Sequence, residues 1–231
     1  MLLRRKADSA WPNLLLLVVV LNVASWVFWE GSRLIRADAV SLTARQLVGL
    51  WASGAKVPAS QHEIDAVREA LQSAIAITPV SSGLQEQLGD LYVVAGRRDW
   101  HNGVARKRHF GEAEAQYQKA LALRPLDPQT WASLAAAYQG LGDTGPRMHQ
   151  AWEKALQLGP NEGHVQPMLL ELALATWPTA SPAMQKWAET LFDASAAPQR
   201  EAINTLALRY GLRFNAAPTS DVDLEASPAI Q

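Results

Sequence analysis

The amino-acid sequence predicts an all-α protein, in which a single N-terminal transmembrane helix is followed by a short α-solenoid with a C-terminal capping helix. Three observations predict this fold class. An uncharged apolar segment runs from Ser9 to Trp29. Three helical segments each end in a proline, at Pro79, Pro125 and Pro160. Alanine and leucine also dominate the apolar residues, which favours helix over strand.

The composition excludes several kinds of chemistry. The chain has 231 residues, which is room for one domain with appendages. It has no cysteine, so disulfides, thiolate metal sites and cysteine nucleophiles are excluded. Lys+Arg total 21 and Asp+Glu total 22, so the overall charge does not point to nucleic acid. The nine tryptophans require a core, a membrane interface or a binding surface.

The first expected element is a transmembrane helix over residues 9–29. As a helix this segment would extend about 31 Å, which matches the hydrocarbon thickness of a bilayer. Trp11 lies at one end, and Trp26 and Trp29 lie at the other, as in an aromatic belt. The alternative is a cleaved signal peptide. The apolar segment continues unbroken to Glu30, which favours an uncleaved anchor.

The charges that flank this segment predict its orientation. Arg4, Arg5 and Lys6 precede it in a short segment, 1–8, and this bias favours a cytoplasmic N-terminus. The remainder would then be the periplasmic part of a single-pass protein of a bacterial inner membrane. We expect a helical linker over 30–59 and a repeat domain over 60–213. Within the linker, "LTARQLVGLWASG" at 42–54 is either the first helix of the half-matched repeat that ends at Pro79 or a helix that continues from the membrane.

The repeat becomes visible when the three helical segments are aligned on their final prolines. Small and large residues recur at helical spacing, which lets neighbouring helices approach closely. Five residues before the proline stand Ala74, Ala120 and Ala155. Eight residues before it stand Leu71, Tyr117 and Trp152. Twelve residues before it stand Val67, Ala113 and Met148.

The residues after two of these prolines complete a known pattern. "LGDLY" begins at Leu88, and "WASLAAAY" begins at Trp131. With the proline-ended helices, they resemble the tetratricopeptide repeat, whose signature is W-x2-L-G-x2-Y, then A-x3-F, then P. The expected signature positions are Leu88, Gly89, Tyr92, Ala113, Tyr117, Ala120, Pro125, Trp131, Leu134, Tyr138, Trp152, Ala155 and Pro160.

A degenerate third unit and a final helix would complete the domain. "LELAL" from Leu170 and "AMQKW" from Ala183 fill the signature positions only loosely. A capping helix is expected to begin at Pro198 and to end at Gly211. Residues 214–231 have little to bury, and we expect a disordered tail.

The resemblance implies where a partner would bind. In tetratricopeptide arrays, the first helix of each pair lines a concave groove that can take a peptide. The matching positions are Gly83, Glu86, Asp90, Val93, Gln129, Ala132, Ala136 and Gln139. They are acidic or neutral, so a clamp for a peptide carboxylate is not expected. The groove would be either an ordinary solvated surface or a site for a neutral or basic segment, with Glu86, Asp90, Gln129 and Gln139 as candidate contacts.

An insertion at residues 97–109 makes the first full repeat longer than the next. Its candidate partner-binding residues are Arg97, Arg98, Trp100, His101, Arg106, Lys107 and Arg108. Three interpretations remain open for it. It is a solvated loop with a helical extension, a contact for an anionic polysaccharide or acidic protein face, or a contact for lipid headgroups. One short basic cluster is too small a footprint for nucleic acid.

Motifs of catalysis do not stand out in the sequence. The five histidines include no pair at helical spacing and no H-E-x-x-H, so we expect no metal site and no cofactor. "GLGDTGP" at 140–146 lacks the ending of a phosphate-binding loop. No G-x-S-x-G is present. The expectation is therefore a binding protein and not an enzyme.

A second resemblance suggests a pathway. The "RRK" start, the single anchor, the few repeats and "LALATWPTASPAMQKWAETLF" at 172–192 are similar to small single-span proteins of bacterial exopolysaccharide gene clusters, of the VpsP/EpsP type. This resemblance implies a non-catalytic, membrane-tethered scaffold that binds protein partners in polysaccharide biosynthesis or export. The alternative is a general periplasmic assembly factor for cytochrome maturation, a pilus or a secretion machine.

Overall fold

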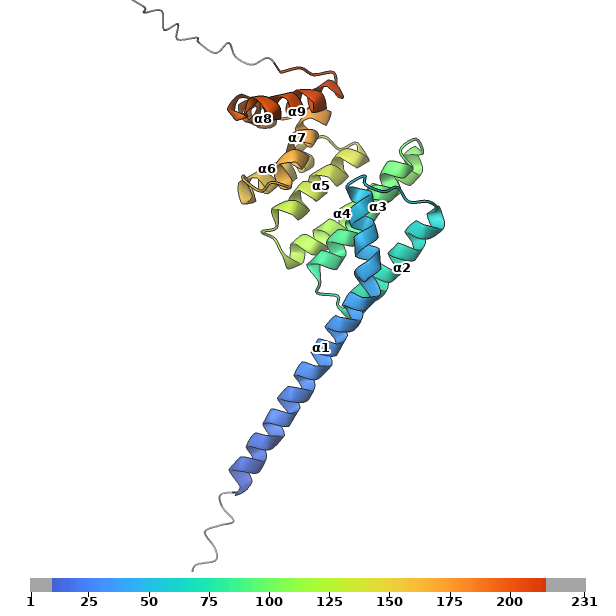
Figure 1. Cartoon of the computed structure of the whole chain (residues 1–231), viewed down its shortest axis with the longest axis vertical. Helices are drawn as coiled ribbons and strands as arrows, with labels where there is room; N and C mark the ends of the chain where they lie inside the picture. Colours follow the sequence, from blue (N-terminus) through green and yellow to red (C-terminus); the bar gives the residue numbers. More distant parts are fainter. Residues whose placement is uncertain (1–9, 215–231) are drawn as a thin grey trace, which may run out of the picture.

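The structure, a computed structural model, describes residues 10–214. Within that range the chain forms nine helices and no strands, which confirms the predicted all-α class (Figure 1). The helices are α1 (Ala10–Ala52), α2 (Gln61–Ile77), α3 (Ser82–Arg98), α4 (Gly103–Leu123), α5 (Pro128–Leu141), α6 (Pro146–Leu158), α7 (Val165–Ala175), α8 (Pro182–Ala194) and α9 (Ala197–Leu208).

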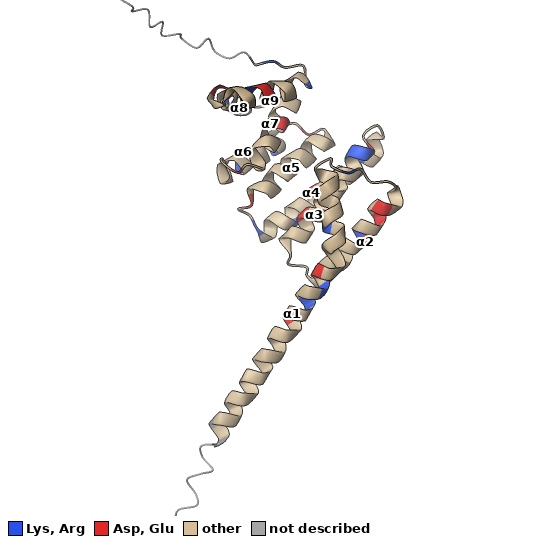
Figure 2. Cartoon of the chain, viewed as in Figure 1, with Lys and Arg blue, Asp and Glu red and all other residues tan. Residues whose placement is uncertain are grey.

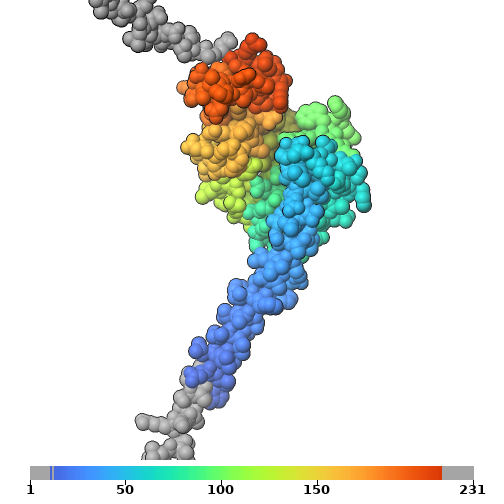
Figure 3. Space-filling view, in the orientation of Figure 1, coloured from blue at the N-terminus to red at the C-terminus, as the bar shows by residue number. Residues whose placement is uncertain are grey.

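The N-terminal half of α1 extends away from the rest of the protein (Figures 1 and 3). Between Trp11 and Trp29, every side chain that the structure describes is exposed. Figure 2 shows no charged residue along this part of the helix. The helix is long and apolar enough to cross a membrane by length and composition. The expectation of an apolar N-terminal helix of spanning length is therefore confirmed.

The C-terminal half of α1 belongs to the folded domain. Its buried residues lie alternately four and three positions apart, which forms one stripe along the helix. They are Ala37, Ser41, Ala44, Val48 and Trp51. This stripe packs against α2 and α3. The segment expected as a helical linker, 30–59, is helical as far as Ala52, but this helix packs into the folded domain, and only the residues after Ala52 form a connection between helices.

Successive helices pack in a regular order. α1 packs on α2, α3 on α4, and α5 on α6, while each pair also contacts the next. The odd-numbered helices form a second series of contacts, α1 with α3, α3 with α5, and α5 with α7. One side of the row is thus made of odd-numbered helices, and α8 and α9 lie at its end (Figure 1).

Side chains at the helix starts explain where the helices begin. The side chains of Ser60, Ser81, Asn102, Asp127 and Ser181 each accept a hydrogen bond from a backbone N–H in the first turn. These bonds satisfy donors that a helix N-terminus leaves free. A proline in the first turn of α5, α6, α8 and α9 adds to the same effect, because its missing N–H costs nothing there.

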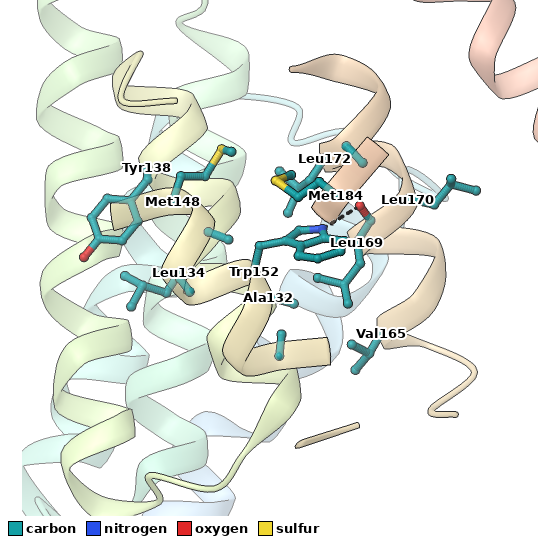
Figure 4. Close-up of a cluster of buried hydrophobic side chains, with 14 of the residues drawn as sticks. Ala132, Leu134, Tyr138, Met148, Trp152, Val165, Leu169, Leu170, Leu172 and Met184 are labelled. Carbon is teal, nitrogen blue, oxygen red and sulfur yellow. Dashed lines mark hydrogen bonds between the residues drawn. The ribbon is translucent and has the colours of Figure 1, made fainter. Parts of the chain in front are cut away.

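The core consists of two hydrophobic clusters, one over α1 to α3 and one over α3 to α9. Trp152 is among the largest fully buried side chains, and its Nε1 donates to the Leu169 carbonyl at 2.9 Å (Figure 4). Gly89 lies directly under Tyr117, because a Cβ at Gly89 would lie 2.6 Å from the Tyr117 ring. This close approach brings α3 and α4 together as the small–large pattern requires.

Most of the other signature positions are also packed. Ten of these residues are buried or partly buried: Leu88, Tyr92, Ala113, Tyr117, Ala120, Trp131, Leu134, Tyr138, Trp152 and Ala155. Pro125 and Pro160 are exposed, and they follow the last residues of α4 and α6. The prolines therefore mark turns, while the other positions contribute to the core.

The insertion at 97–109 is a helical hairpin and not a loop, and we call it the basic hairpin. Its first two residues end α3 and its last seven begin α4, with a short turn between them. Phe110 follows it and fills the space beside Gly96 and Gly140, where an added Cβ would lie 2.8 Å and 2.3 Å from the ring. The basic hairpin is therefore fastened to both neighbouring helices at its base.

The last described residues cover the C-terminal end of the row. α9 begins at Ala197, one residue before the predicted start, and the chain after it turns at Gly211, where φ is 73°. Phe214 packs on Trp177 and Phe192 at ring-centroid distances of 5.6 Å and 5.3 Å. Of the tail predicted over 214–231, residues 215–231 lie outside the described part.

A pocket between the odd-numbered helices

A pocket of about 400 Å³ lies on the side of the row that the odd-numbered helices form. We call it the α3–α5–α7 pocket. α3 supplies Asp90, Val93 and Arg97, and α5 supplies Gln129, Ser133 and Ala136. His164 and Met168, at the start of α7, complete the far wall.

Helical spacing explains why these side chains share one face. Residues three or four apart lie above one another on a helix. Asp90, Val93 and Arg97 follow this spacing on α3, and the three residues of α5 follow it as well. Each helix therefore turns one narrow face to the pocket, while its other faces pack into the core.

The end of α1 forms part of the same pocket. Ala52 is the last residue of α1, and it lines the pocket together with Ser53. Because α1 also packs on α3, the helix that begins with the long apolar segment ends beside Asp90 and Arg97. Any movement of α1 relative to α3 would change the shape of this pocket.

Asp90 provides the buried charge of the pocket. The Tyr117 hydroxyl donates a hydrogen bond to Asp90 Oδ1 at 2.7 Å. Burial raises the pKa of Asp90 to about 6, although this hydrogen bond and the positive charge of Arg97 oppose the increase. Burial also raises the pKa of the Tyr117 hydroxyl, so that this group remains a donor.

Glu86 lies one helical turn before Asp90 on α3, and it does not line the pocket itself. Burial raises the pKa of Glu86 to about 7, and the negative charges of Asp90 and Asp127 add to this increase. Thr130 and Arg124 act in the opposite direction. Two carboxyl groups near the pocket therefore change their charge close to neutral pH.

Gln129 brings an unused acceptor to the pocket. Its side-chain oxygen, Oε1, is buried and accepts no hydrogen bond from the described residues. An acceptor in this state costs free energy until it finds a donor. Gln129 and Asp90 together make this part of the pocket suited to a ligand that donates hydrogen bonds, such as a peptide N–H or an amino group.

The basic hairpin forms a separate surface beyond the far end of α3. Trp100 is 46% exposed, and the Arg106 guanidinium lies over its ring at 4.7 Å from the centroid. Trp100 also contacts Phe110 edge-on, with ring centroids 6.5 Å apart. The exposed residues Arg98, His101, Lys107 and Arg108 surround this pair, so the surface is basic with an aromatic centre.

His109 anchors the basic hairpin from the inside. Its Nε2 lies 3.2 Å from Asp99 Oδ2, and its ring stacks on Tyr92 at a centroid distance of 6.5 Å. Burial lowers the pKa of His109, and the neighbouring Arg108 lowers it further, while Asp99 raises it. His109 therefore acts in packing and is not exposed to a partner.

The structure separates the predicted site residues into two groups. Asp90, Arg97 and Gln129 come together in the α3–α5–α7 pocket, together with Val93 and Ala136 from the predicted groove positions. Glu86 lies next to them, and Gln139 does not line the pocket. The remaining candidates belong to the basic hairpin, which meets the pocket only at Arg97.

Sequence reasoning missed five pocket residues that lie on other elements or between the matched positions. They are Ala52, Ser53, Ser133, His164 and Met168. Ser133 could have been found, because it lies one turn after Gln129 on the same face of α5. His164 and Met168 lie in the segment expected to form a degenerate third unit, where no signature sets the register. Ser53 follows a helix that was assigned to a linker.

Neither a metal centre nor a known relative adds to this picture. Within residues 10–214, no three or more His, Asp or Glu side chains are grouped so that they could hold a metal ion. A comparison with models of known protein families finds none that matches the chain. A comparison with curated proteins finds no matching relative. The function must therefore be argued from the pocket, the basic hairpin and α1.

Proposed function

We propose that this chain is a membrane-tethered, non-catalytic scaffold of the tetratricopeptide-repeat type, which binds a segment of a protein partner in the α3–α5–α7 pocket. α1 would anchor it in a bacterial inner membrane, with the folded domain in the periplasm. The partners would be proteins of exopolysaccharide biosynthesis or export. The observation that carries the proposal is the pocket between alternate helices, with Asp90 and the unused Gln129 oxygen in its wall.

The order of helix contacts supports the repeat assignment. Antiparallel pairs whose first helices contact one another in turn are the arrangement expected of stacked helical repeats. α1, α3, α5 and α7 occupy the place of the first helices, and α2, α4 and α6 that of the second. The approach of Gly89 to Tyr117 is the contact expected between the small position of one helix and the large position of its partner.

The chemistry of the pocket supports binding of a peptide segment. Asp90 and Gln129 are fixed acceptors, and Ala136 leaves room between them and α7. A peptide supplies N–H donors at regular intervals, and its side chains can fill the apolar positions at Val93 and Met168. The scaffold proposal thus rests on a surface that a second chain can complete.

The proposal is tested by co-isolation of partners with the full-length chain from detergent-solubilised membranes. Ala136→Trp would fill the pocket with an indole, and Ala122→Trp is the matched control at an exposed position of α4. We expect the first variant to lose partners that the wild type and the second variant retain. Equal recovery of partners by all three chains would overturn the pocket as the binding site.

A charge-reversal variant of the basic hairpin separates the two surfaces. Lys107→Glu with Arg108→Glu changes two exposed residues and leaves the pocket intact. We expect it to retain the partners that Ala136→Trp loses. The identity of the partners decides the pathway, because recovery of cytochrome-maturation, pilus or secretion components without polysaccharide enzymes would contradict the exopolysaccharide assignment.

A further inference from the structure

α2 and α1 are joined at the height where the apolar segment ends. Arg33 forms an ion pair with Glu30 on α1 at 3.0 Å, and its Nη2 donates to the Ile77 carbonyl at 2.7 Å. Ile77 is the last residue of α2. The turn between α2 and α3, residues 78–81, is therefore held against α1 close to the first charged residues after the span.

This height corresponds to the headgroup layer of a bilayer in which α1 is anchored. Arg33 follows Trp29 by one helical turn, which is about 6 Å along the axis. The headgroup layer on each side of the hydrocarbon is roughly 5–8 Å thick. With Trp26 and Trp29 at the edge of the hydrocarbon, the 78–81 turn lies at the depth of the lipid headgroups.

Three of the residues exposed at this height are apolar, beside the exposed charges of Arg36 and Asp38, although a turn in water would favour polar side chains. Val80 is 77% exposed at the tip of the turn. Leu34 and Ile35, on α1, are 60% and 71% exposed. These two residues border a hollow of about 650 Å³ between α1 and the start of α3, which Thr78 and Ser81 of the same turn also line. Such side chains are stabilised when lipid and not water surrounds them.

The three equivalent turns of the row change character with distance from α1. In each, one residue follows the proline that ends the preceding helix: Val80, Leu126 and Asn161. The α2–α3 and α4–α5 turns lie nearer α1 than the α6–α7 turn does (Figure 1). Val80 and Leu126, in the first two turns, are apolar and highly exposed, whereas Asn161, in the third, is polar. The exposed Arg124 beside Leu126 is paired with Asp127 at 3.3 Å, so this turn adds no net charge to the apolar side chain.

We infer that the base of the folded domain, formed by the 78–81 turn together with Leu34 and Ile35, rests in the headgroup layer of the same bilayer that α1 spans. The inference rests on the anchor in the proposed function and adds to it a second, lipid-contacting surface. The folded domain is then in direct contact with the bilayer surface and keeps a defined orientation relative to it. The α3–α5–α7 pocket and the basic hairpin are held at defined heights above the lipid.

The basic hairpin points the other way. α3 rises from the 78–81 turn for 17 residues, which is about 25 Å, and the basic hairpin lies at its far end. Contact with lipid headgroups was one of the three interpretations of the 97–109 insertion. On this inference that contact is made instead by the 78–81 turn, at the opposite end of α3. The basic hairpin faces away from the lipid, where an anionic partner can reach it.

Depth-dependent fluorescence quenching tests the inference on the full-length chain in liposomes that contain headgroup-labelled nitroxide lipid. The chain has no cysteine, so one introduced cysteine carries one fluorophore without background. Val80→Cys is compared with Val104→Cys, an equally apolar and exposed position in the basic hairpin. We expect the label at residue 80 to lose most of its fluorescence and the label at residue 104 to keep it.

Labels at Leu126→Cys and Asn161→Cys extend the test along the row, and we expect quenching to decrease from 80 to 126 to 161. Alkaline extraction of the same liposomes separates the two claims. If the chain stays in the membrane and the label at 80 is quenched no more than the label at 104, contact of the 78–81 turn with the headgroups is ruled out, while membrane anchoring by α1 is kept. If intact chain is released, anchoring by α1 is ruled out, and the headgroup contact that depends on it is ruled out as well.

Discussion

Glu86 and Asp90 show how single residues connect the pocket to stability. Both carboxyl groups are more easily protonated in the folded chain than in water, because burial disfavours their charged forms and raises the pKa of each. The folded state therefore binds protons more tightly than the unfolded state between about pH 4 and pH 7. The stability that this difference adds is complete below that range and is lost as the pH rises through it.

Glu86→Gln tests this linkage. The neutral amide removes the cost of a buried charge, so the variant should be more stable than the wild type by on the order of 2 kcal/mol at pH 8. The advantage should disappear below about pH 4, where Glu86 is mostly protonated in both states. Urea unfolding of the full-length chain in detergent at several pH values measures it. Glu69→Gln, at an exposed position of α2, is the control and should show no such change.

Some of the residues that line the pocket could be named from the sequence through the repeat resemblance. The groove positions from the tetratricopeptide resemblance include Asp90, Val93, Gln129 and Ala136, all of which line the pocket. Ser133 and His164 were not predicted, since the resemblance names only a few positions on each helix and none reliably in the third unit. The pKa shifts of Glu86 and Asp90 were beyond sequence reasoning, because they arise from burial among side chains of other helices.

At the scale of elements, α1 combines two environments in one continuous helix. The charges at Glu30, Arg33 and Arg36 mark the end of the apolar segment, but a change of polarity does not end a helix. After these charges, one residue in every three or four is buried, as far as Trp51. This spacing is that of an amphipathic helix. The sequence could predict a helix in 30–59, but it could not show that this helix packs into the folded domain, because that depends on its contacts with α2 and α3.

Ala44→Glu tests the role of this second half of α1. Ala44 is buried against the α2–α3 core, so a glutamate there places an unpaired charge in it and should cost about 3–5 kcal/mol of unfolding free energy. Thr43→Glu changes the adjacent, exposed residue and should stay within about 0.5 kcal/mol of the wild type. Thermal unfolding of the full-length chains gives both values. Similar melting of the two variants would show that this part of α1 is a linker after all.

The basic hairpin illustrates the opposite limit of prediction. The excess length between Tyr92 and Ala113 was visible in the sequence, but its structure was not. Asn102 caps α4 early, and Phe110 packs beside Gly96 and Gly140, so both helices lengthen and no free loop forms. A glycine that makes room for an aromatic ring of another helix cannot be recognised from the sequence, because it is not known there which helices pack together.

At the scale of the whole molecule, the sequence was sufficient for the class of fold and for the apolar N-terminal helix. Helix-forming composition, proline-ended segments and one long uncharged segment are local signals, and each predicted an element that the described residues contain. The partner and the pathway are a different matter, since a fold does not determine function. Those parts of the account are proposals that depend on what the α3–α5–α7 pocket binds.

Site-specific photo-crosslinking in living cells tests that dependence most directly. A photoreactive amino acid replaces Gln129, whose side chain lines the pocket, or Gln118, which is exposed on α4. The account predicts that residue 129 forms a crosslink to a protein of the cell envelope and that residue 118 does not. Crosslinks from residue 118 alone, or none from residue 129 while the basic hairpin crosslinks efficiently, would contradict a partner-binding pocket between the odd-numbered helices.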